Sequence, residues 1–137
     1  MKSIWCFALA AMVFLATGIS SAEVPDMLGV WTGSWNGYDD GAGYSNLSEN
    51  DSITLTIVEQ KDRIFSGNIT IQLDNETMDG KGFAGAIGLD GKTLYAAEFD
   101  GGYAVGTIIS KDEMELIYLK DGENGSVAID RFYRIKE

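Results

Sequence analysis

From residue 52 onwards, apolar and polar side chains alternate along the chain with a period of two residues. In residues 52–60, the side chains of Ile53, Leu55 and Ile57 fall on one face, and threonines fall on the other. Residues 64–73 repeat the pattern. Alternation of this kind is typical of a β-strand that buries one face. After residue 23 we find no stretch with the 3.6-residue period of an amphipathic helix, so the pattern predicts an all-β protein.

Turn signals divide this pattern into eight segments. Asp-Gly pairs, which favour tight hairpins, recur between the alternating runs. Short connections of this kind are typical of an up-and-down antiparallel meander, and closure into a barrel removes its exposed edges. We therefore predict an eight-stranded up-and-down antiparallel β-barrel that forms a single domain over residues 23–137, with a two-sheet sandwich as the alternative. The predicted strands are 29–37, 52–60, 64–73, 81–89, 93–99, 103–110, 113–120 and 126–136.

The first 22 residues have the pattern of a secretory signal peptide. Lys2 precedes an apolar run at residues 4–16, and small residues at Ser20 and Ala22 favour cleavage after Ala22. An uncleaved membrane anchor is the alternative, but the apolar segment ends before the ~20 residues that a spanning helix needs. We expect a secreted protein, and the remaining chain from residue 23 has no cysteine.

Composition excludes several kinds of chemistry. The chain has no histidine, so catalysis by histidine and metal sites with histidine ligands are ruled out. We expect no catalytic residues, no metal and no cofactor. The formal net charge is −11, and a surface this acidic repels nucleic acid and anionic lipid. The expected partner is therefore a small-molecule ligand or a protein, and neither nucleic acid nor, for the mature form, a membrane.

Five asparagines begin an Asn-x-Ser/Thr sequon, the acceptor sequence for N-linked sugar. This pattern predicts an exported glycoprotein. In an organism that does not use the sequon, it would mean only that asparagine shares turns with serine and threonine. The predicted glycosylation sites are Asn46, Asn50, Asn68, Asn75 and Asn124.

The first predicted strand contains Gly29-x-Trp31, followed in register by Gly33-x-Trp35. A Gly-x-Trp near the start of an eight-strand meander resembles the calycin superfamily, which includes lipocalins, fatty-acid-binding proteins and avidins. The resemblance implies that Trp31 closes one end of the barrel, under an arginine from the last strand. Arg131 and Arg134 are the candidates, and we expect Arg131, because it alternates in phase with apolar neighbours. The chain lacks the disulfide, flanking helix and helical lid of some calycins, and no particular ligand is implied.

The longer predicted loops, 38–51, 74–81, 100–102 and 120–125, share the other end of the barrel and are strongly acidic. We expect the ligand to enter there, and a cationic, calcium-bridged or neutral ligand suits this field better than an anion. Among the acidic residues, Glu98 falls in the middle of a strand, and we expect it to point outward or to form a salt bridge. The predicted ligand-binding residues are Trp35, Tyr38, Tyr44, Phe83, Tyr103 and Tyr118.

Two functions remain open on the sequence. The leading one is a non-catalytic barrel that binds a small apolar or amphipathic molecule. The alternative is a surface interaction or inhibitor protein, with a filled barrel that binds another protein through the 38–51 and 74–81 loops. The presence of a ligand-sized cavity would distinguish them. An enzyme with a carboxylate pair is the weakest interpretation, and the oligomeric state is left open.

Overall fold

The computed structural model describes residues 23–74 and 76–136. Over these ranges the chain forms nine β-strands, and it contains no helix long and apolar enough to cross a membrane. The strands are β1 (Gly29–Asp39), β2 (Gly43–Asn46), β3 (Ser52–Lys61), β4 (Ile64–Leu73), β5 (Glu76–Ile87), β6 (Thr93–Glu98), β7 (Tyr103–Ser110), β8 (Glu113–Lys120) and β9 (Ser126–Arg134).

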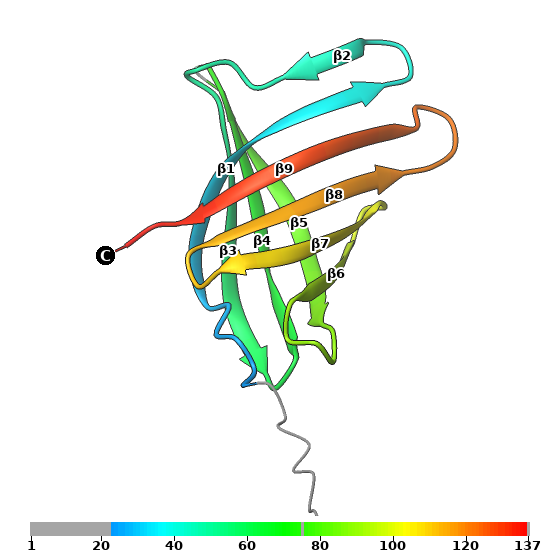
Figure 1. Ribbon diagram of the computed structural model, residues 1–137. Helices are drawn as coiled ribbons and strands as arrows, with labels where there is room; N and C mark the ends of the chain where they lie inside the picture. The colour runs from blue at the N-terminus through cyan, green and yellow to red at the C-terminus, as the bar shows by residue number, and fades with distance from the viewer. Residues whose placement is uncertain (1–22, 75, 137) are drawn as a thin grey trace, which may run out of the picture.

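The sheet closes on itself. From β3 to β9, each strand pairs antiparallel with the next, and β9 pairs with β1 (Figure 1). The other edge of β1 pairs with β3 through residues 29–33 and with β2 through residues 36–39. The predicted eight-stranded antiparallel barrel is confirmed, with β2 as a short addition at one end.

Most strand ends lie within two residues of the prediction, but the strand β2 and the early start of β5 were not predicted. The short strand β2 lies within the predicted 38–51 loop, where its polar sequence gave no alternation to detect. β5 begins at Glu76, so the Asp-Gly pair at 79–80 lies inside a strand and not in a turn. Residues 80 and 81 of β5 stand opposite the single residue Ile69 of β4, which is a β-bulge. A Cβ at Gly80 would lie 2.3 Å from the backbone oxygen of Ile69, so glycine here permits close strand contact.

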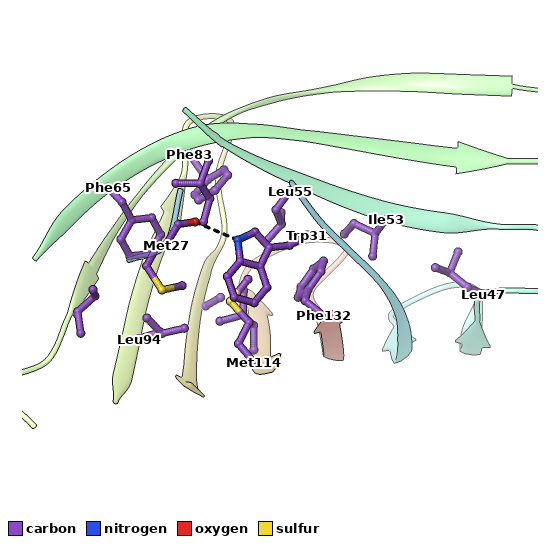
Figure 2. Packing of buried hydrophobic residues seen from close by; sticks show 14 residues of the cluster. Met27, Trp31, Leu47, Ile53, Leu55, Phe65, Phe83, Leu94, Met114 and Phe132 are labelled. Carbon is purple, nitrogen blue, oxygen red and sulfur yellow. Dashed lines mark hydrogen bonds between the residues drawn. The ribbon is translucent and has the colours of Figure 1, made fainter. Parts of the chain in front are cut away.

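The inward side chains of the barrel form one hydrophobic core (Figure 2). Trp31, with 0% of its surface exposed, packs at the centre of the closed end with Phe132, Met114 and Met27. Met27 precedes β1, so the segment before the first strand plugs this end of the barrel. The Trp31 indole Nε1–H donates a hydrogen bond of 3.0 Å to the backbone oxygen of Met27. This bond satisfies the one polar atom of the buried indole.

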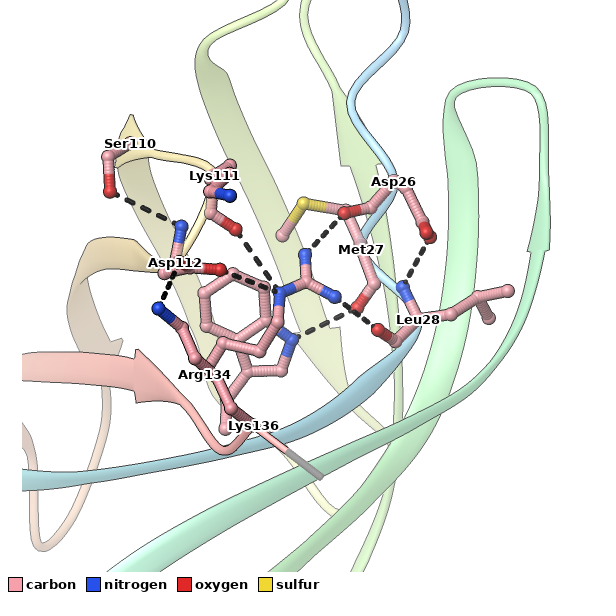
Figure 3. Close-up of polar contacts among 9 residues, drawn as sticks. Asp26, Met27, Leu28, Ser110, Lys111, Asp112, Arg134 and Lys136 are labelled. Carbon is pink, nitrogen blue, oxygen red and sulfur yellow. Dashed lines mark hydrogen bonds and ion pairs between the residues drawn. The ribbon is translucent and has the colours of Figure 1, made fainter.

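Arg134 lies over Trp31. Figure 3 shows its guanidinium beside residues 26–28, the segment before β1, which it holds in place. The Cζ atom of its guanidinium is 4.3 Å from the centroid of the indole ring. The guanidinium donates hydrogen bonds to the backbone oxygens of Asp26, Leu28 and Lys111. The Trp–Arg closure that the calycin resemblance implied is therefore present.

The choice of Arg131 as the closing arginine was wrong. Inward positions on β9 are even-numbered, with Asp130 and Phe132 buried, whereas Arg131 lies on the outer face. Its guanidinium donates to Glu113 at 2.6 Å and to Glu115 at 2.8 Å on the neighbouring strand. The parity was misread because Val127, Ile129 and Tyr133, which looked like core residues, are exposed.

Two predicted features lie outside the described residues. They are the signal peptide, residues 1–22, and the sequon asparagine Asn75. The other four sequon asparagines are exposed, two of them on strands and two in turns. They are Asn46, Asn50, Asn68 and Asn124.

Candidate functional site

The end of the barrel where β9 begins opens into a cavity of about 490 Å³, here called the mouth cavity. Its walls come mainly from β1, β4, β5 and β9. Ligand pockets in proteins measure ~300–1,000 Å³ and are lined mainly by apolar and aromatic side chains. The mouth cavity matches this description. Its apolar and aromatic lining includes Trp35, Tyr38, Ile53, Ile69, Ile71, Met78, Tyr118 and Ala128.

The floor of the mouth cavity is shared with a smaller internal cavity of about 40 Å³, which borders the core. The residues that line both are Ile53, Ile69, Glu98, Tyr118 and Asp130. Two carboxylates and a phenol therefore stand at the junction of the open cavity and the packed interior.

Asp130 is the most buried charged residue of the described chain, with 8% of its surface exposed. It occupies an inward position on β9. Its Cα pairs with those of Trp35 on β1 and Leu116 on β8. Glu98 enters the same cavities from β6, on the inward face with Leu94 and Ala96. Across the described residues, neither carboxylate has a hydrogen bond or an ion pair. The expectation that Glu98 points outward or forms a salt bridge was therefore wrong.

Burial changes the proton affinity of these groups. Desolvation, together with the negative charge of Glu98, raises the pKa of Asp130 to about 7. Desolvation and the nearby Asp100 also raise the pKa of Glu98, and Lys120 opposes this shift. Desolvation and the neighbouring carboxylates raise the pKa of Tyr118 to about 12. A carboxyl that titrates near pH 7 can pair with a cation as the anion and can exchange a proton with a bound molecule.

The rim of the mouth cavity is acidic as well. Asp39, Asp79 and Asp100 contribute to its lining, and none of its described lining residues is a lysine or an arginine. Over the ranges 23–74 and 76–136, no group of three or more acidic, histidine or cysteine side chains is arranged to hold a metal ion. The electrostatic potential in the mouth cavity is therefore negative, and its source is the set of carboxylates that line the cavity.

The predicted ligand-binding residues separate into three groups. Trp35, Tyr38 and Tyr118 line the mouth cavity. Phe83 is buried and lines only the smaller cavity. Tyr103 lies on the outer face, and Tyr44 is 91% exposed on β2, with its ring 5.0 Å from that of Tyr38. The structure thus brings three of the six together at the cavity.

Sequence reasoning missed Asp130 and misplaced Glu98. The available signal was alternation, because Asp130 shares its phase with Phe132 and Arg134. Selecting Arg134 as the closing arginine would have placed Asp130 inside the barrel. For Glu98, the phase with Leu94 and Ala96 was visible, but the cost of burying an unpaired charge argued against it.

No protein-family model and no curated protein sequence matches the chain. Among solved structures, the fold is similar to that of the S-type phycobiliprotein lyase CPES from Guillardia theta. The match has a TM-score of 0.53 and 12% sequence identity, and it covers 81% of this chain and 89% of that chain. At this identity the likeness shows only a shared fold, that of a closed antiparallel β-barrel.

The comparison corrects one expectation from the sequence. We expected a protein without enzymatic activity and without catalytic residues, but the similar structure is that of a lyase. A barrel of this architecture is thus found in a protein named as an enzyme. The architecture and the missing histidine were not sufficient grounds for that expectation.

Proposed function

We propose that this protein binds a small apolar or amphipathic molecule in the mouth cavity. The observation that carries the proposal is the cavity itself, about 490 Å³ in volume and lined by Trp35, Tyr38 and several isoleucines. A barrel that acted only through its surface would gain nothing from such a volume, because unfilled space loses packing contacts. The cavity therefore favours ligand binding over the filled barrel that binds a protein through its 38–51 and 74–81 loops.

The proposal also places the protein outside the cytoplasm. Its support is the signal-peptide pattern of residues 1–22, together with four sequon asparagines that are exposed. Intact mass measurement of the protein from its own source tests both points. Cleavage after Ala22 and additional mass removed by an amidase specific for N-linked sugar would support them. An intact N-terminus would contradict the export proposal.

Ligand binding can be tested with N-phenyl-1-naphthylamine, an uncharged fluorophore that brightens in apolar surroundings. The blocking variant is Ala128→Trp, because Ala128 points into the mouth cavity from β9. The matched control is Ile129→Trp, which adds an indole at the next residue on the outer face. Circular dichroism would establish that both variants are folded.

We expect saturable brightening with wild type and Ile129→Trp, and its loss with Ala128→Trp. Equal brightening of all three proteins would place the dye on the surface and contradict the proposal. The absence of brightening with wild type would contradict it as well.

A further inference from the structure

We infer that the mouth cavity selects organic cations, molecules in which a protonated nitrogen is attached to an apolar body, and that Asp130 is the counter-ion. The inference rests on the proposed function and specifies the chemical class of its ligand.

Asp130 is a buried acid that the fold leaves without a partner. More than nine-tenths of its surface is covered, and its side chain lines both cavities. In the described part of the chain, no donor reaches its carboxylate. Buried charges in proteins are normally paired, because an unpaired one loses its hydration without compensation. A cation delivered by a ligand would supply the missing partner.

The arginine beside it in the sequence does not fill this role. Arg131 points to the outer face and is bonded to Glu113 and Glu115. Arg134 is committed to Trp31 and to three backbone oxygens at the closed end. The basic side chains of β9 are thus engaged elsewhere, and the anionic floor remains exposed to the cavity.

Aromatic residues stand beside the carboxylate. Trp35 is the register partner of Asp130 on β1, and Tyr118 is the register partner of Ala128, the next inward residue on β9. Both line the mouth cavity. Aromatic rings attract organic cations through their negative faces, most strongly in the case of tryptophan. A protonated nitrogen with an apolar body would meet a carboxylate and two aromatic side chains.

The charges around the floor determine the pH dependence. Asp130 on β9 faces Glu98 on β6 and Tyr118 on β8, with Asp39, Asp79 and Asp100 at the rim and Lys120 acting on Glu98. Burial raises the pKa of Asp130 to about 7, so its anion forms as the pH rises through neutrality. A primary amine stays largely protonated up to pH 8. Preference for the cation should therefore increase between pH 5.5 and pH 8.

The test uses two compounds that differ in one group, 1-naphthalenemethanamine and 1-naphthalenemethanol. Each would be titrated at pH 8 and pH 5.5 as a competitor of N-phenyl-1-naphthylamine. The variants are Asp130→Asn, which keeps the side-chain shape, and Asp121→Asn, which removes one negative charge from an exposed turn at the same end. The second variant controls for the general field of the acidic surface.

At pH 8 we expect the amine to compete about ten-fold more strongly than the alcohol with wild type and Asp121→Asn, as a charge-assisted contact predicts. We expect the preference to shrink at pH 5.5 and to disappear in Asp130→Asn. Equal competition by amine and alcohol, an undiminished preference in Asp130→Asn, or an equal loss in both variants would overturn the inference while leaving the proposed function intact. Failure of the dye itself to bind would overturn both.

Discussion

The guanidinium of Arg134 lies over the indole of Trp31, with 4.3 Å between Cζ and the ring centroid. The two residues join the first and last strands of the barrel at their Cα pair. The guanidinium also holds the segment before β1 through the backbone oxygens of Asp26 and Leu28. Arg134 therefore holds one end of the barrel together with Gln60, which is hydrogen-bonded to Pro25 and Met27. The opposite end contains the mouth cavity.

Replacement of Arg134 by methionine should lower the free energy of unfolding by about 2–3 kcal/mol, because a cation–π contact and several charge-assisted hydrogen bonds are lost. The matched change, Arg131→Met, removes an ion pair on the outer face and should lower the free energy of unfolding much less, because solvent-exposed ion pairs contribute little to stability. Denaturant unfolding of the two variants would measure both values. A larger loss for Arg131→Met would contradict the assignment of Arg134 as the closing residue.

Gly33 permits the close approach of β1 and β9. A Cβ at this position would lie 2.0 Å from the backbone oxygen of Arg131, so an alanine can be accommodated only if the two strands separate. We expect Gly33→Ala to destabilise the barrel by about 3 kcal/mol or more, in the range of strained buried substitutions. The neighbouring Ser34→Ala, on the exposed face, is the control and should have little effect. Similar melting temperatures for the two variants would count against this account of the closure.

The stability of the protein should depend on Asp130 in a pH-dependent way. Its pKa is raised to about 7 in the folded state, above the ~3.9 of an unfolded chain. The folded state therefore binds this proton more tightly, so ionisation of Asp130 progressively reduces stability from about pH 4 to pH 7. We expect Asp130→Asn to raise the free energy of unfolding by roughly 2–4 kcal/mol at pH 8 and to change it little at pH 4.

The control for this measurement is Asp121→Asn, an exposed acid whose removal should have a similar small effect at both pH values. If Asp130→Asn instead destabilised the protein equally at pH 4 and pH 8, its carboxylate would have a stabilising partner in the fold. That result would conflict with the unpaired state described above.

The protonation state of Glu98 should affect the pKa of Asp130. The negative charge of Glu98 contributes to the raised pKa of Asp130. Glu98→Gln should therefore lower the pKa of Asp130, as measured by the carbon-13 shift of its carboxyl group during an NMR titration. Glu115→Gln, which changes an acid on the outer face beside Arg131, should leave it unchanged. An unaltered pKa in Glu98→Gln would mean that the two groups do not share the floor of the cavity.

Alternation and turn residues were sufficient to predict the fold because they reflect local physics. A strand that buries one face must alternate, as the set Ile53, Leu55 and Ile57 does, and those three side chains are buried. The Gly-x-Trp resemblance then placed Trp31 at the closed end. Information of this kind is carried by neighbours in the sequence.

Alternation misled on β9, where apolar side chains occupy both faces. Val127 and Ile129 are as hydrophobic as core residues, yet they are exposed. Asp130, on the opposite face of the same strand, is buried. Which face of β9 turns inward depends on its register with β1 and β8, a long-range property. The same holds for the meeting of Glu98 and Asp130, which lie on strands that are not adjacent in the sheet.

The most direct test of the mouth cavity as the binding site is an NMR titration of the two barrel tryptophans with N-phenyl-1-naphthylamine. Trp35 lines the mouth cavity, and Trp31 is sealed in the opposite end, so their indole N–H signals report on the two ends separately. Trp35→Phe would assign the signals. The account predicts a saturable shift of the Trp35 signal with the Trp31 signal unmoved. A shift of Trp31 alone, or no shift of either while the dye binds, would contradict it.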